Sequence, residues 1–144
     1  MSRKKSREFV LQILYQIDLS DKWDSYKKTI TEFFKERITE EPIREFSGYI
    51  INGIMKHKAF IDALIDQNTS TSSIESLHYI DRNVLRIALF ELFFSELVPI
   101  DVAINEAINL AKKYGEQKSG ALVNAILDSI KNKNQDKLEY KKDL

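Results

Sequence analysis

The sequence predicts an all-α protein of about seven helices in two packed helical subdomains. Apolar residues recur at helical spacing almost everywhere, and no segment alternates convincingly between apolar and polar residues. Gly and Pro are scarce, with four and two among 144 residues. A chain of this length suits one domain with a substantial core. We therefore expect a single domain over 1–131, a seam between its halves near 68–73, and a charged, frayed tail over 132–144.

The first half of the chain is expected to form three helices. Their apolar stripes lie in 9–17, 30–38 and 46–65, and the last stripe reads as one long helix. Gly48 and Gly53 lie inside this third helix, where each costs about 1 kcal/mol relative to Ala. We expect both glycines to let a neighbouring helix approach closely.

The second half begins with a short turn around 74–77, followed by a helix with Asp81 at its start. The run from Val84 to Phe94 is apolar on nearly every face, which predicts a central helix or one covered by a partner. The next helix is two-faced and ends before Gly115, a residue typical of the position after a helix. A last helix covers about 119–130. Its inward residues are expected to be Leu122, Val123, Ile126 and Leu127.

The composition excludes several classes of protein. There is no Cys, which rules out a disulfide framework and a thiolate metal site and fits a reducing cytoplasm. Apolar runs are shorter than the roughly 20 residues of a membrane span, and no secretory signal is visible. Because Lys+Arg and Asp+Glu both number 22, only the distribution of charge can indicate a partner.

No catalytic motif is present. The two histidines, His57 and His78, lie in different segments, and His57 is expected to be a half-exposed surface residue. No glycine-rich phosphate loop, zinc motif or calcium loop is found. We expect a protein that is not an enzyme and that has no cofactor, no catalytic residue and no metal site.

A basic cluster opens the chain. Its members are Arg3, Lys4, Lys5 and Arg7, which run directly into the first apolar stripe. Cations near a helix N-terminus are unfavourable by about 0.3–1 kcal/mol each, so their presence favours an anion that arrives there, such as a nucleic-acid backbone. The alternatives are a disordered, solubilising terminus or contact with an acidic protein surface.

A second basic patch surrounds the turn before the last helix. It contains Lys112, Lys113 and Lys118, and Ser119 opens the helix that follows. Tyr114 could stack on a base, because aromatic faces stack on any base, or it could be a core residue. The two patches gain force as a binding surface if they adjoin in space.

Four segments resemble the NusB transcription antitermination family in order and spacing. They are "RKKSREFVLQILYQIDL", "IDRNVLRIALFEL", "VPIDVAINEAINLAKKYG" and "SGALVNAILD", so the resemblance covers about Arg3 to Ile130. It implies an all-helical fold that binds single-stranded boxA RNA in nascent rRNA transcripts together with the ribosomal protein NusE. It further implies indirect contact with the RNA polymerase antitermination complex and a role in rRNA transcription and maturation.

The resemblance also assigns site residues. RNA contacts are implied for the basic cluster and for Lys118, Ser119 and Leu122. Contacts with the ribosomal protein are implied for Tyr15, Glu75 and Asp81. Leu122 stands where relatives carry an aromatic residue, so stacking there is lost although apolar contact with a base remains possible. Lys118 stands where an acidic residue can occur and should strengthen phosphate binding. For Asp81 the alternative is a helix N-cap and nothing more.

Two other interpretations remain open at this point. The same fold occurs as the N-terminal domain of an rRNA cytosine methyltransferase, of which this chain would be a fragment without the cofactor domain. The chain could also be a helical interaction protein that forms a homodimer through its Phe-rich helix and binds no nucleic acid.

Overall fold

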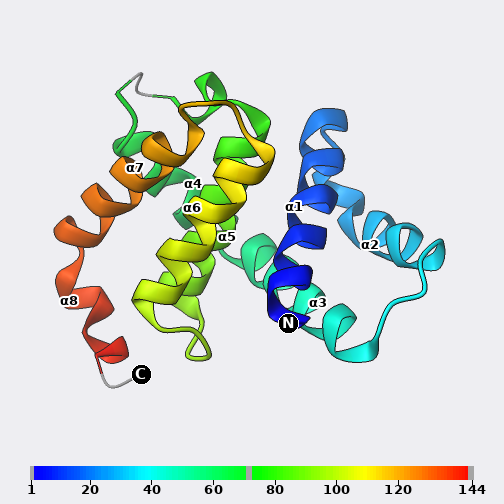
Figure 1. Ribbon diagram of the computed structural model, residues 1–144. Coiled ribbons are helices and arrows are strands. Elements are labelled where there is room, and N and C mark those ends of the chain that lie inside the picture. Colours follow the sequence, from blue (N-terminus) through cyan, green and yellow to red (C-terminus); the bar gives the residue numbers. More distant parts are fainter. Residues whose placement is uncertain (1, 71–72, 143–144) are drawn as a thin grey trace.

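The computed structural model describes residues 2–70 and 73–142, which form helices and connecting turns without a strand (Figure 1). Single 3₁₀ turns cover Trp23–Ser25 (η1), Ile74–Ser76 (η2) and Glu139–Lys141 (η3). The helices are α1 (Ser2–Ser20), α2 (Tyr26–Lys35), α3 (Glu41–Lys56), α4 (Lys58–Gln67), α5 (Tyr79–Phe94), α6 (Ile100–Tyr114), α7 (Ser119–Lys133) and α8 (Gln135–Leu138). The predicted all-α class is confirmed.

Helix α5 lies at the centre of the molecule. Every residue from Asn83 to Leu92 is buried, and α1, α3, α4, α6 and α7 all pack against this helix. In Figure 1, α1, α2 and α3 lie to one side of α5, α7 and α8 lie to the other, and α6 crosses α5 in this view. A helix that is apolar on nearly every face can be stable only where neighbours cover it on all sides, so the predicted central position of this segment is confirmed.

The core is continuous across the two groups of helices, because one cluster of buried apolar residues extends from α1 to α8. The seam expected at 68–73 includes residues 71–72, which lie outside the described part of the chain. On either side of it, α4 and α5 pack against each other.

The tail expected to fray is instead helical as far as Lys141. Leu138 and Lys141 are 3% and 2% exposed, so this segment docks on the bundle. The Tyr140 hydroxyl donates to the carbonyl of Leu92 at 2.8 Å, and the Lys141 ammonium donates to the carbonyl of Glu91. Burial lowers the pKa of Lys141 to about 8, against a smaller opposing effect of the Glu91 charge. Residues 143–144, at the end of the expected tail, lie outside the described residues.

The single helix expected over 46–65 is wrong, because the chain bends at His57 between α3 and α4. The N–H of His57 is shared between the carbonyls of Gly53 and Ile54, and its ring stacks on Phe94 with centroids 3.6 Å apart. Burial, and then the charge of Lys56, lowers the pKa of this histidine. Helical spacing continues on both sides of the bend, so the apolar pattern alone gives no sign of it.

The two glycines of α3 have different surroundings. A Cβ added at Gly53 would overlap the ring of Phe90, so this glycine does allow α3 and α5 to approach closely. At Gly48 an added Cβ would meet nothing within 4 Å, and the same expectation is wrong there.

A buried ionic network fixes α1 and α4 to α5. The carboxylate of Asp18, which is 8% exposed, accepts hydrogen bonds from Arg82 at 2.6 and 2.7 Å and from Arg86 at 3.0 Å. Arg86 also donates to Asp62 of α4 at 2.8 Å. Although burial alone would raise the pKa of Asp18, the two arginines hold that pKa below its ordinary value.

Candidate nucleic-acid interface

The basic cluster lies within α1, which begins at Ser2 rather than at the first residue of the apolar stripe. Arg3, Lys4 and Lys5 are exposed, and the first turn of α1 contains no acidic residue. The Arg3 guanidinium donates to the carbonyl of Leu97 at 3.1 Å and lies 5.0 Å from the centroid of the Phe46 ring. These three side chains therefore form a cationic surface, anchored through Arg3, at a helix N-terminus. Backbone N–H groups at such a terminus also favour an anion.

Arg7 does not belong to this surface. It is 4% exposed, and its guanidinium forms a bidentate ion pair with the Glu91 carboxylate, with hydrogen bonds of 2.9 and 2.8 Å. Glu91 is itself 1% exposed. The predicted RNA contact of Arg7 therefore needs correction, since a charge buried in a pair cannot reach a phosphate without breaking the fold. Residue 7 faces inward because it lies on the apolar face of α1, beside Val10 and Leu14.

The two basic patches adjoin, and Glu8 joins them. The Lys113 ammonium at the end of α6 donates to Glu8 at 2.5 Å, and Lys5 lies 3.9 Å from the same carboxylate. The hydrogen bond from Lys113 is the main reason why the pKa of Glu8 is lowered, and that bond also raises the pKa of Lys113. Glu8 is 6% exposed, so the lysines stand above it at the surface.

The predicted RNA contacts near the turn between α6 and α7 differ in their exposure to solvent. Lys118 is exposed, and Leu122, one helical turn later, is 36% exposed, so the inward position predicted for Leu122 is wrong. Ser119 is 2% exposed, and its hydroxyl accepts the N–H of Glu116 at 2.8 Å. Lys118 and Leu122 therefore share an accessible face, whereas Ser119 shapes the turn.

Gly115 has an extended backbone, with φ −93°, so the turn does not need glycine for a left-handed conformation. It needs glycine because there is no room for a side chain. A Cβ at this position would overlap Ser119, so a larger residue would push the turn open.

Next to this turn lies a pocket of about 270 Å³. Asp81 lines it, is 2% exposed, and has an Oδ1 atom without a hydrogen-bond partner among the described residues. Tyr15 and Tyr79 meet edge to face at its wall, with centroids 5.9 Å apart. The other lining residues are His78, Ile80, Tyr114, Gly115, Glu116 and Ser119.

The predicted partner contacts are thus partly brought together. Tyr15 and Asp81 share the pocket, whereas exposed Glu75 lies on η2 and is not among the lining residues. Its carboxylate accepts the Ser73 hydroxyl at 2.7 Å, which is the main reason why its pKa is lowered. The N-cap role considered for Asp81 is wrong, because the N-cap of α5 is His78 and Asp81 is the third residue of the helix.

Tyr114 connects the basic surface with the pocket. Tyr114 is half-buried, with its ring 5.3 Å from the Lys113 ammonium, and it lines the pocket together with Ser119. The basic surface and the pocket therefore meet at the turn between α6 and α7. Sequence reasoning missed Glu8, which looks like one more charged residue until α6 is placed beside α1.

Clusters of metal ligands and membrane-spanning helices are both lacking in the described part of the chain. No group of three or more His, Cys, Asp or Glu residues there could hold a metal ion. Within 2–70 and 73–142, no helix has the length and apolar character needed to cross a membrane.

Comparison with known proteins places these features in context. The NusB family model matches residues 4–132. The transcription antitermination protein NusB of Dehalococcoides mccartyi (strain ATCC BAA-2266 / KCTC 15142 / 195) is 46% identical over 131 residues, which cover 90% of this chain and 89% of the relative. The corresponding protein of Bacillus subtilis (strain 168) is 33% identical over 131 residues, covering 91% and 95%.

Solved structures agree with the family match. A structure of T. maritima NusB superimposes with a TM-score of 0.84 at 34% identity, covering 95% of this chain and 96% of that one. A crystal structure of the antitermination factors NusB and NusE in complex with dsRNA contains a chain with a TM-score of 0.82 at 27% identity, covering 92% and 97%.

Proposed function

Since this chain belongs to the NusB family, we propose that it binds boxA-type RNA of nascent rRNA transcripts together with the ribosomal protein NusE. In this role it acts in the cytoplasm by binding and not by catalysis, and it reaches RNA polymerase only through the assembled antitermination complex. The RNA lies along Arg3, Lys4 and Lys5 and continues past Lys113 to Lys118 and Leu122.

The observation that carries the RNA part is the joining of the two basic patches through Glu8. Lys5 and Lys113 come from segments more than 100 residues apart, yet both approach the same carboxylate, at 3.9 and 2.5 Å. Glu8 thereby limits the repulsion between the two ammonium groups and keeps them side by side. A row of cations next to an apolar residue, Leu122, suits a strand with phosphates on one side and unstacked bases on the other.

The unpaired oxygen of Asp81 supports the partner part. A buried acceptor without a donor costs about 1–3 kcal/mol, more when it is charged. A cationic or N–H donor from a basic ribosomal protein would remove that cost on binding. Tyr15 and Tyr79 beside the carboxylate supply the aromatic surface that is enriched at protein interfaces.

Salt dependence tests the RNA part. Replacing both Lys4 and Lys5 by Ala should lower the log–log slope of affinity against salt on single-stranded RNA by about 1.4, since each lost phosphate contact contributes about 0.7. The matched control changes two exposed lysines of α2, Lys27 and Lys28, to Ala. Equal slopes for both variants would remove α1 from the RNA surface.

The kind of RNA is tested with the complete heterodimer. A single-stranded boxA-like oligonucleotide should bind more tightly than its scrambled counterpart and more tightly than its duplex, and NusE should raise the affinity. Equal affinity for the boxA-like and scrambled strands would reduce the protein to a general RNA binder. Preference for the duplex would mean that the groove of paired RNA, and not splayed bases, is recognised.

Binding of NusE tests the pocket. Asp81→Asn keeps the shape of the side chain and removes its charge, so affinity for NusE should fall roughly 10- to 100-fold, the equivalent of a charge-assisted hydrogen bond. The control is Asp101→Asn, which changes an exposed acid in the first turn of α6. An unchanged affinity in the Asp81 variant rejects the assignment. A homodimer that ignores NusE would favour the interaction-protein alternative.

A further inference from the structure

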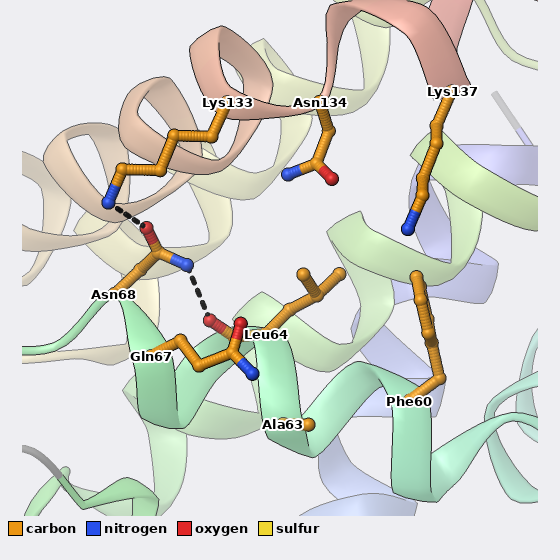
Figure 2. A pocket seen from close by; sticks show the side chains of 8 residues that line it. All are labelled: Phe60, Ala63, Leu64, Gln67, Asn68, Lys133, Asn134 and Lys137. Atoms are coloured by element: carbon orange, nitrogen blue, oxygen red, sulfur yellow. Dashed lines mark hydrogen bonds between the residues drawn. The ribbon is translucent and has the colours of Figure 1, made fainter.

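A second pocket, of about 370 Å³, lies between α4 and the junction of α7 with α8 (Figure 2). Its lining residues are Phe60, Ala63, Leu64, Gln67, Asn68, Lys133, Asn134 and Lys137. Three of them, Lys133, Asn134 and Lys137, follow residue 132, where the family match ends. The docked tail therefore supplies lining residues that lie beyond the matched range.

The charges of this pocket have one sign. Lys133 and Lys137 line it and no carboxylate does, whereas each of the other described pockets includes at least one Asp or Glu. Neither lysine forms an ion pair with an acidic residue in the described part of the chain. In Figure 2 both side chains extend from the tail towards α4. Two ammonium groups without a neutralising partner make the pocket attractive to an anion.

The two lysine ammonium groups are not needed to satisfy the last carbonyls of α4 and α7. The last carbonyls of a helix attract cations, but here side-chain amides satisfy two of them. The Asn68 amide donates to the carbonyl of Leu64, and the Asn134 amide donates to that of Ile130, each at 2.8 Å. The Asn68 oxygen accepts from Lys133 at 3.2 Å, which holds that ammonium at the rim of the pocket.

An aromatic ring lies opposite the lysines. Phe60 is half-buried, and edge-to-face contacts with Phe93 and Phe94, at 5.7 and 5.5 Å between centroids, fix its orientation. The Lys137 ammonium lies 5.3 Å from the centroid of the Phe60 ring. Ala63 and Leu64 extend the apolar surface beside it. The pocket thus combines a flat apolar face with a cationic rim and amide groups.

We propose that this pocket binds a nucleotide unit, with its phosphate between Lys133 and Lys137 and its base against Phe60. Aromatic side chains that stack on bases, together with cations that hold the phosphates, bind single-stranded nucleic acid without reading its sequence. The site is separate from the RNA surface described above, because α7 places about 16 Å between Leu122, the residue of that surface on this helix, and Lys133. The unit can come from an RNA strand or from a free nucleotide.

Amide NMR signals provide the test. Titration of the full chain with a nucleoside monophosphate should shift the side-chain signals of Asn68, Asn134 and Gln67, and the unphosphorylated nucleoside should shift them far less. Inorganic phosphate alone should also bind more weakly, because it cannot use the ring. Equal shifts with phosphate and with the nucleotide would overturn the assignment to a nucleotide, and so would no shift at millimolar ligand.

Matched variants separate the pocket from general charge. Lys133→Ala combined with Lys137→Ala should abolish the shifts and lower the salt slope on a single-stranded oligonucleotide by up to about 1.4. The control is again the pair Lys27→Ala and Lys28→Ala, which removes the same charge elsewhere. Retention of the shifts in the pocket variant would refute the proposal.

Two further titrations identify the source of the nucleotide and test whether the site is independent of the RNA surface at α1. Tighter binding of an oligonucleotide than of the monophosphate at these signals identifies an RNA strand, and the reverse identifies a free nucleotide. Replacing Lys4 and Lys5 by Ala should leave the shifts at Asn68 unchanged. Failure of the RNA surface at α1 and failure of this pocket are therefore distinguishable.

Discussion

Replacing Arg7 by Met would separate the structural cation of α1 from its exposed neighbours. The side chain of Met has a similar length and keeps the packing volume, but it leaves the Glu91 carboxylate, 1% exposed, without its two hydrogen bonds. Removing one partner of a buried ion pair costs about 3–5 kcal/mol. For a chain of this length, about 1 kcal/mol lowers Tm by 2–4 °C, so a loss of roughly 10 °C is expected.

Urea unfolding and thermal melting measure this loss. The same scans on Lys4→Met, which changes an exposed cation of the same helix, should shift the free energy of unfolding by no more than about 0.5 kcal/mol. Adding Glu91→Leu to Arg7→Met should recover most of the stability, because an apolar pair of similar volume often replaces a buried ion pair at little cost. The Lys141 bond survives both changes, since it goes to the main-chain carbonyl.

RNA binding by the folded protein decides the interpretation. The Arg7→Met protein, once corrected for its folded fraction, should keep the affinity and salt slope of the parent. If it melts like the parent but loses RNA affinity, then Arg7 contacts RNA and the buried pair opens on binding.

Three further predictions concern the fold. Gly53→Ala should destabilise by about 1–3 kcal/mol because its Cβ overlaps Phe90, whereas Gly48→Ala, with open space, should stabilise by up to about 1 kcal/mol; the urea midpoints of the pair check both. Lys141 has a folded pKa near 8, below its ordinary value, so stability should rise with pH from about 8 towards 10.5. Lys141→Met should abolish this rise and be more stable than the parent at neutral pH. Asp18→Asn should destabilise at neutral pH, and its difference from the parent should shrink as acid protonates Asp18, whose folded pKa is lowered; a constant difference down to low pH would contradict this.

Local patterns were sufficient for much of the secondary structure. The stripe in 9–17 and the two-faced segment before Gly115 predicted helices where α1 and α6 occur, and the all-round apolar run predicted the central position of α5. These predictions succeed because helical periodicity reflects which face must be buried, a property that each segment carries by itself. The bend at His57 and the inward turn of Arg7 were missed, since the same spacing fits a straight helix and the same charge fits an exposed one.

The sequence also indicated which kinds of residue belong to the candidate site, but it did not indicate how they are grouped in space. It predicted a cationic start of α1 and a second patch before α7, and the resemblance added Tyr15 and Asp81. Their grouping depends on the packing of α1 against α5 and α6. Only that packing buries the Asp81 oxygen in a pocket and places Lys113 against Glu8.

The sequence by itself therefore determined the fold class, the positions of most helices and the presence of excess positive charge at two separate points. Tertiary structure alone decided which cations remain at the surface. Arg7 and Lys141 carry the same charge as Lys4, but burial against Glu91 commits the first two to the interior. The physical reason is that burial and ion pairing depend on which distant segments meet, and residues 84 or 105 positions apart leave no mark in the local pattern.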